Sequence, residues 1–163
     1  MARLMCVAAV TAPKCRGRNR LTVATLSVEE RDRLAREMRS VTEESGARGF
    51  ARDADGVESA GAVVLLGVRS ERSDLDPCSF CGFGNCDEME AAGGACGHCL
   101  IDLGIAVGSA VSVAADHRVD NRVLYTAGLA AMRIGLLPSD LVAAVGIPLS
   151  ATAKNPYFDR RPK

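Results

Sequence analysis

The chain has 163 residues, with 20 basic and 20 acidic side chains, so its formal net charge is zero. This length allows one domain (residues 1–163) with a core that needs no disulfide reinforcement, and the zero charge argues against a nucleic-acid-binding protein. The N-terminus lacks the pattern of a signal peptide, which predicts a cytoplasmic protein. In that compartment seven cysteines indicate metal or redox chemistry rather than a disulfide framework.

The first expected elements are a helix and a short strand. Residues 1–12 are mostly apolar, and Pro13 ends the helix that they predict. Residues 20–26 (RLTVATL) are rich in β-branched side chains, which is typical of a strand. The first twenty residues also carry five basic side chains and no acidic one: Arg3, Lys14, Arg16, Arg18 and Arg20.

The next helix and strand have clear signals. Ser27 and Glu30 form a capping box at the start of the helix, and Gly46 follows it as a stop. Residues 61–68 (GAVVLLGV) form a continuous apolar run of strand length, as expected in a sheet that is covered on both faces.

A long apolar stretch, residues 99–115, predicts a helix. Only thirteen uncharged residues run from Leu103 to Ala115, too few to cross a bilayer, so we expect this helix to be buried in protein and the chain to have no membrane partner. Small residues recur every four positions along it, and this stripe allows close approach of another backbone, either in a homodimer or within one subunit: Gly104, Gly108 and Ser112.

The last part of the chain predicts one more helix and one more strand. Residues 119–135 form the helix, with Asp120 or Asn121 as its cap and Gly135 at its end. Residues 141–148 form the strand, and an irregular basic tail follows. Three strands separated by helices indicate an α/β or α+β domain with helices packed on a central sheet.

The segment 74–99 contains five cysteines. The first three follow the spacing C-x2-C-x4-C: Cys78, Cys81 and Cys86. A [4Fe-4S] cluster needs four thiolates, so its loop must fold back on itself, and Gly82 and Gly84 suit such a loop because they lack a Cβ. The spacing predicts an iron-sulfur site whose fourth ligand is Cys96 or Cys99, without choosing between them.

A zinc site is the main alternative. Two C-x2-C pairs separated by fourteen residues are close to the spacing of a zinc ribbon. The four zinc ligands would be Cys78, Cys81, Cys96 and Cys99. Under this interpretation Cys86 is a spare thiol, His98 can replace one ligand, and the domain is a structural or interaction module. The cluster interpretation is favoured because it uses Cys86 and explains the glycines; a disulfide or a set of buried thiols is the weakest alternative.

Six blocks of the sequence together form a pattern. They are TAPKCRG (11–17), AVVLLGV (62–68), CSFCGFGNC (78–86), CLIDLGIAVGSAV (99–111), VDNRVLYTAG (119–128) and GIPLSATAKNPYFDR (146–160). This pattern resembles a family of uncharacterised bacterial and archaeal proteins that contain a ferredoxin domain. In that family one cysteine precedes the aspartate of the DLGIA block by six residues, which here is Cys96 before Asp102. The resemblance implies a [4Fe-4S] cluster held by Cys78, Cys81, Cys86 and Cys96, with Cys99 as an extra thiol.

A weaker pattern concerns residues 8–26, together with LAAMRIGLL (129–137) and LVAAVGIPLS (141–150). It is similar to the FMN-dependent nitroreductases, in which a helix, a loop at the flavin and a strand follow one another. The similarity implies a nitroreductase-like fold with an inserted cysteine-rich loop, and a homodimer with FMN at the subunit interface. Lys14, Arg16 and Arg18 are then candidates to bind the flavin phosphate. The chain would be a flavin-linked oxidoreductase.

Acidic residues surround the cysteines. Between positions 71 and 90 the only basic residue is Arg72, against six acids: Glu71, Asp74, Asp76, Asp87, Glu88 and Glu90. Such a patch can steer a basic redox partner protein toward the site. The sequence therefore favours an iron-sulfur protein with an electron-transfer or redox role.

Overall fold

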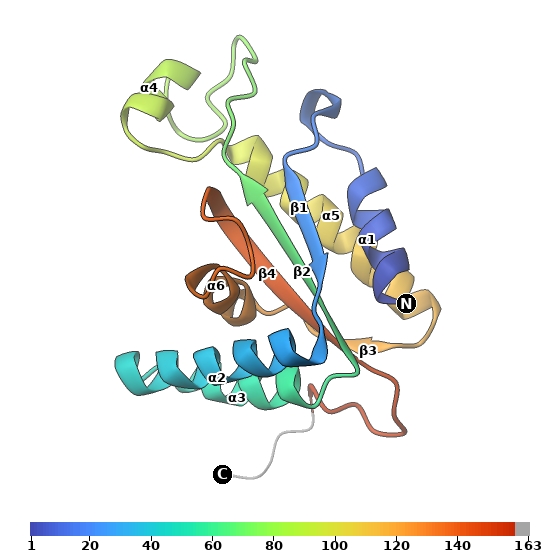
Figure 1. Cartoon of the computed structure of the whole chain (residues 1–163). Coiled ribbons are helices and arrows are strands. Elements are labelled where there is room, and N and C mark those ends of the chain that lie inside the picture. The colour runs from blue at the N-terminus through green and yellow to red at the C-terminus, as the bar shows by residue number, and fades with distance from the viewer. Residues whose placement is uncertain (159–163) are drawn as a thin grey trace.

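The computed structural model describes residues 1–158 as a four-stranded antiparallel sheet with helices on both faces (Figure 1). The strands are β1 (Leu21–Thr25), β2 (Ala62–Arg69), β3 (Asp120–Asn121) and β4 (Leu141–Ser150), in the order β1-β2-β4-β3. Every neighbouring pair is antiparallel. The predicted class is confirmed as α+β, with one short strand more than the sequence indicated.

The helices form two layers around this sheet. They are α1 (Ala2–Thr11), η1 (Cys15–Gly17), α2 (Val28–Ser45), α3 (Arg48–Glu58), α4 (Cys86–Ala91), α5 (Gly97–Asp116) and α6 (Tyr125–Arg133). One core joins α1 and α5 to the sheet, and a second core joins α2, α3 and α6 to its other face. α5 and α6 therefore lie on opposite faces of the sheet.

The central strand β2 is buried on both faces, as its apolar sequence predicted. Val63 and Leu65 belong to the core with α2, α3 and α6. The residues that point to the other face contact α1 and α5: Val64, Leu66 and Val68. All five are at most 1% exposed. Each contributes about 2 kcal/mol by leaving water, so β2 holds the two layers together.

The first two helices begin and end where their sequence signals lie. α1 ends two residues before Pro13. At the start of α2 the Ser27 hydroxyl accepts the Glu30 N–H at 3.2 Å, and the Glu30 carboxylate accepts the Ser27 N–H at 2.8 Å. Gly46 ends the helix in the left-handed conformation, with φ 72°. The capping-box prediction is therefore confirmed.

Two helices were not predicted. α3 contains two glycines and two aspartates, which weaken its helical signal, yet Phe50, Ala54 and Val57 are buried at helical spacing. α4 has only six residues, and its one signal is Asn85 followed by Glu88. Both helices depend on contacts with distant segments rather than on local preference.

The predicted start of the last helix is wrong. Asp120 and Asn121 form β3 instead of a helix cap, and α6 begins only at Tyr125. The reason is a pairing with the sheet: the Leu124 N–H and carbonyl exchange hydrogen bonds with Gly146 on β4, at 2.8 and 2.9 Å. The chain therefore stays extended before the helix begins. The predicted end at Gly135 is confirmed by a left-handed φ of 71°.

Full burial of α5 is also a wrong prediction. The helix starts at Gly97 and has 20 residues, and only 33% of its apolar stretch is buried within the protein. With a mean hydropathy of 1.7 it is long and apolar enough, by length and composition only, to cross a membrane. Its inner face packs in the core with α1 and β2. Leu100, Ile101 and Ile105 on its outer face are exposed.

The C-terminal segment leaves β4 as an irregular tail, as predicted, and Tyr157 is buried beside Gly56 of α3. Arg122 donates to the Tyr157 carbonyl at 3.0 Å and holds the tail against the short β3 region. The last residues of the GIPLSATAKNPYFDR block and the basic end that follows them, residues 159–163, lie outside the described residues.

Gly128 lies where α6 crosses β4, so a substitution at this residue tests how closely the helix packs on the strand. A Cβ here would overlap the Ala144 carbonyl group and lie 2.5 Å from the Val145 nitrogen. These are backbone atoms of a central strand, so we expect Gly128→Ala to lower the free energy of unfolding by about 3 kcal/mol in urea denaturation. Gly49→Ala in α3, where an added Cβ meets nothing within 4 Å, is the control and should change it by less than about 1 kcal/mol. Equal stability of the two variants would contradict the close packing of α6 on β4.

Candidate metal centre

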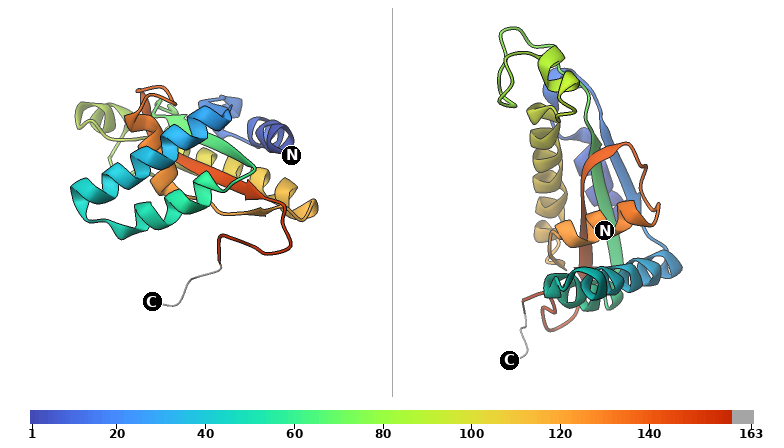
Figure 2. Two further views of the ribbon diagram at one scale, coloured as in Figure 1. Left: turned by 60° about the horizontal axis from the view of Figure 1, so that its bottom comes forward. Right: turned by 90° about the vertical axis from the view of Figure 1, so that its left-hand side faces the viewer.

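The cysteine-rich segment leaves the sheet at the end of β2 and returns at the start of α5 (Figure 1). It therefore lies at the end of the sheet opposite to α2 and α3 (Figure 2). The segment that contains η1 comes to the same end, because it precedes β1, which is antiparallel to β2. Three stretches that are distant in sequence thus meet around the thiols.

Cys96 and Cys99 lie at the start of α5 and face the residues that follow β2. The Cys96 sulfur is 3.4 Å from the Ser73 hydroxyl, and the Cys96 N–H donates to the Ser70 hydroxyl at 3.0 Å. The Cys99 thiol donates to the Glu71 carbonyl at 3.3 Å. Both sulfurs are therefore fixed against the segment of residues 70–73.

These two thiols differ in acidity. Burial opposes ionisation of Cys96, but the Ser73 hydroxyl and the backbone N–H groups of His98 and Cys99 outweigh it, so the pKa of Cys96 is lower than that of an ordinary thiol. Burial raises the pKa of Cys99, and the Glu71 backbone and the Arg20 guanidinium only partly offset this rise. The thiolate, which is the metal-binding form, is thus favoured at Cys96.

Cys81 comes close to the start of α5 because Gly97 has no side chain. A Cβ on Gly97 would lie 3.1 Å from the Phe80 ring, 3.4 Å from the Phe80 carbonyl oxygen and 3.6 Å from the Cys81 Cα. Cys81 is partly buried against the core that contains Cys96 and Cys99. The glycine therefore allows this part of the loop to rest directly on the helix start.

Cys78 lies at a shallow surface depression beside His98. Its sulfur is 3.7 Å from the His98 Nε2, and the His98 ring stacks on Phe80 with centroids 5.0 Å apart. Leu75, Pro77 and Ser79 line the same depression. His98 thus contacts a cysteine, as the zinc alternative requires of a substitute ligand.

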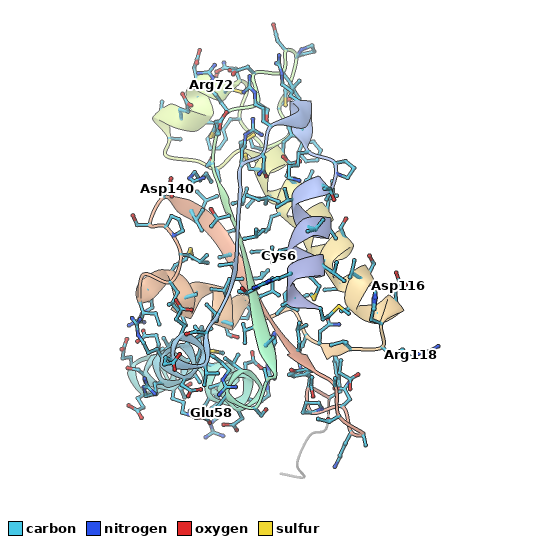
Figure 3. All side chains as sticks on the ribbon, turned by 45° about the vertical axis from the view of Figure 1, so that its right-hand side comes forward. Cys6, Glu58, Arg72, Asp116, Arg118 and Asp140 are labelled. Carbon is cyan, nitrogen blue, oxygen red and sulfur yellow. The ribbon has the colours of Figure 1, made fainter. Side chains whose placement is uncertain are left out.

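Cys86 is the first residue of α4, which polar contacts hold in place. The Asn85 side chain accepts the Glu88 N–H at 2.9 Å, and the Gly84 N–H donates to the Glu88 carboxylate at 3.0 Å. Arg72 joins α4 to the segment after β2, because its guanidinium binds Asp74, Asp87 and Glu90. Figure 3 shows Arg72 beside α4, at the opposite end of the molecule from Glu58 on α3.

The predicted ligands share one region, but they do not form a single-ion site. All seven cysteines are free, and no three His, Cys, Asp or Glu side chains within residues 1–158 approach closely enough to hold one metal ion. The closest pairs are Cys96 with Cys99 and Cys78 with His98. Zinc needs all its sulfurs about 2.3 Å from one point, whereas a [4Fe-4S] cube spreads its thiolates over four irons. The donor chemistry, thiols from one loop and one helix start, fits the cube.

A buried ionic network lies directly behind these thiols. The Arg20 guanidinium donates to the Ser73 hydroxyl at 3.3 Å and to the Arg72 carbonyl at 3.2 Å, and it lies 3.8 Å from the Asp102 carboxylate. Asp102 in turn accepts the Cys15 N–H at 2.9 Å. Arg20 and Asp102 are both 3% exposed. Sequence reasoning gave Asp102 no role at the site and missed Arg20 and Ser73; an arginine at the first residue of an apolar strand was the only available signal.

The residues predicted to bind a flavin phosphate lie at the same end of the sheet and contact the protein itself. Lys14 donates to the Ala9, Val10 and Ala12 carbonyls and caps α1, and desolvation lowers its pKa more than Asp102 raises it. Arg16 donates to the carbonyls of residues 73 and 74. Arg18 donates to the Glu71 carboxylate and the Arg72 carbonyl. Arg16 and Arg18 therefore bind the base of the cysteine loop, whereas Lys14 binds the end of α1.

Comparison with known proteins places the chain in a family. Residues 92–160 match a family model described as "Uncharacterized protein containing a ferredoxin domain", and this range includes Cys96, Cys99 and Asp102. An uncharacterised protein of Archaeoglobus fulgidus is 39% identical over 170 residues, which cover 99% of this chain and 91% of that protein. The chain belongs to this ferredoxin-domain family. The first resemblance noted in the sequence is therefore confirmed.

Solved structures show that this family member has the nitroreductase fold. Nitroreductase A from Vibrio parahaemolyticus superimposes with a TM-score of 0.60 and 15% identity, over 98% of this chain and 60% of that one. A protein from Desulfovibrio desulfuricans, described as a nitroreductase in complex with FMN, gives 0.61 and 17%, over 98% and 77%. The chain thus spans less than two thirds of the length of the first of these proteins. At such identities the likeness establishes the fold alone.

The cap of α4 tests whether Cys86 is held as described. Asn85→Ala removes the acceptor of the Glu88 N–H, which typically costs about 1 kcal/mol, so amide exchange within α4 should become about fivefold faster. Asn85→Ser keeps an acceptor and should restore most of the protection. Hydrogen exchange followed by mass spectrometry measures both variants. Equal exchange in Asn85→Ala and the unmodified chain would contradict the capping role.

Proposed function

We propose that this chain is a cytoplasmic iron-sulfur protein that binds one [4Fe-4S] cluster in a ferredoxin-type site and serves electron transfer or redox sensing. The proposed ligands are Cys78, Cys81, Cys86 and Cys96. The observation that carries the proposal is the gathering of five free thiols at one end of the sheet, two of which, Cys96 and Cys99, lie within the residues that match the ferredoxin-domain family model. When bound, the cluster supplies one-electron transfer.

The chain's own residues support such a site in two ways. The N-terminus of α5 and the Ser73 hydroxyl favour a thiolate at Cys96, which is the form that binds iron. The hydroxyl of Ser70 and the carbonyl of Glu71 fix the backbone of Cys96 and the thiol of Cys99. Cys96 and Cys99 are therefore held by the core, and the loop carries the other three thiols at the same end of the sheet.

Cysteine variants test the ligand set. Serine at Cys78, Cys81, Cys86 or Cys96 should remove most of the iron, sulfide and visible absorption from chain purified without oxygen, because a serine hydroxyl is a poor replacement for a thiolate. Two control variants should keep the iron, the sulfide and the absorption: Cys99→Ser, next to the site, and Cys6→Ser in α1. Metal analysis and an optical spectrum measure the result. A chain that binds zinc instead of iron, and that loses the zinc in Cys99→Ser but keeps it in Cys86→Ser, would favour the zinc-binding structural module.

A second candidate function is a flavin-linked oxidoreductase, which the nitroreductase fold and the FMN complex of one structural neighbour favour. Such a protein would be a homodimer with FMN at the subunit interface, near Lys14, Arg16 and Arg18. The exposed apolar side chains of α1 and α5 form a surface for the second copy: Leu4, Val7, Val10, Leu100, Ile101 and Ile105. Gly104 and Gly108, with nothing near an added Cβ, allow close approach there.

A charge on this surface tests the dimer and the flavin together. Ile101→Asp should give a monomer in sedimentation velocity and abolish the quenching of added FMN fluorescence, because a buried unpaired carboxylate disfavours the interface. Leu129→Asp, a comparably exposed site on α6, should leave both unchanged. If the unmodified chain is a monomer and leaves FMN fluorescence unaltered, the proposal of a dimeric flavoprotein is contradicted. The proposal of an iron-sulfur protein is unaffected by that result.

The proposed partner of the site is a basic redox protein. Arg72 neutralises only part of the acidic surface, through Asp74, Asp87 and Glu90. The remaining negative charge around the loop favours a positively charged surface, at low ionic strength above all.

A further inference from the structure

Among residues 1–158 one arginine, Arg20, is buried, and it lies next to the candidate ligands. The Arg20 side chain is 1% exposed; its guanidinium lies 3.8 Å from the similarly buried Asp102 carboxylate and 3.7 Å from the half-exposed Glu71 carboxylate. Hydrogen bonds do not saturate either group: Arg20 Nε and Asp102 Oδ2 are buried without a hydrogen-bond partner among the described residues. Burying two ions whose hydrogen bonds are incomplete is unfavourable for folding. The retention of this pair points to a role at the neighbouring site.

A single hydroxyl connects Arg20 to the proposed fourth ligand. Arg20 Nη1 donates to Ser73 Oγ at 3.3 Å, and Ser73 Oγ is 3.4 Å from Cys96 Sγ. Arg20 and Cys99 also share a neighbour, because Arg20 Nε lies 3.7 Å from the Glu71 carboxylate and the Cys99 thiol donates to the Glu71 carbonyl at 3.3 Å. The guanidinium is therefore near the sulfurs whichever of the two cysteines is the ligand.

We infer that Arg20 and Asp102 are a pair of opposed charges that set the reduction potential of the proposed cluster. This inference rests on the proposed iron-sulfur function and deepens it. Reduction adds one electron to the cluster, so a fixed positive charge nearby stabilises the reduced form and raises the potential, and a fixed negative charge lowers it. Because both groups are buried, added salt does not screen them as it screens surface charges.

The inference predicts opposite shifts from the two members of one pair. Arg20→Gln should lower the midpoint potential of the loaded chain, Asp102→Asn should raise it, and the double variant should return toward the unmodified value. Arg20→Lys keeps the charge and should stay closer to the unmodified chain than Arg20→Gln. Spectroelectrochemical titration without oxygen, at low and high salt, measures the potential, and circular dichroism confirms folding.

Arg18→Gln is the matched control. Arg18 donates to the same Arg72 carbonyl as Arg20 does, but its side chain is 40% exposed. We expect a smaller shift that disappears at high salt. If Arg20→Gln does not fold, Asp102→Asn still reports the sign of its shift, and the double variant, which leaves no unpaired buried charge, still tests the cancellation. A merely structural pair would give shifts of the same sign, or none.

The outcomes separate this inference from the proposed function. If the unmodified chain carries no iron or sulfide, both the inference and the proposed function are contradicted. A chain that carries the cluster, with a potential that Arg20→Gln and Asp102→Asn leave unchanged or move in one direction, overturns the inference alone. Opposite, salt-independent shifts that cancel in the double variant support it.

Discussion

The contacts of the buried Arg20 guanidinium hold together the three segments that form the candidate metal centre. Arg20 lies just before β1, the Arg72 carbonyl and the Ser73 hydroxyl follow β2, and Asp102 belongs to α5. Arg20 is thus a shared partner of the first turns of α5 and the base of the cysteine loop, which also contact each other directly through Cys96 and Cys99. The geometry of Cys96 and Cys99 depends on this junction, because Ser73 and its neighbours fix both thiols.

The site consists of a firmly held part and a loosely held part. Cys96 and Cys99 belong to the apolar core with α1 and β2. Cys86 lies on a six-residue helix that has one side chain in the core, Met89, and is otherwise held by a cap and exposed ion pairs. Exposed ion pairs contribute little to stability. The proposed cluster would link the two parts, because its proposed ligands include Cys96 as well as the loop cysteines.

Local signals in the sequence predicted much of the fold, and long-range contacts account for what they missed. The Ser27 capping box, the Gly46 stop and the apolar β2 run act through neighbouring residues, and the structure has all three. The late start of α6 depends on Leu124 pairing with a strand far along the chain. The exposed outer face of α5 could not be predicted, because its residues are as apolar as the buried ones. For the site, spacing found the cysteines, but Arg20 and Ser73 acquire their role only when β1 lies beside β2.

Native mass spectrometry of the unmodified chain, purified and sprayed without oxygen, tests the central claim most directly, because one spectrum identifies the bound inorganic group, any flavin and the number of subunits. The account predicts that each chain carries the added mass of four irons and four sulfides. A chain that carries a single zinc ion, or no inorganic mass at all, would contradict it.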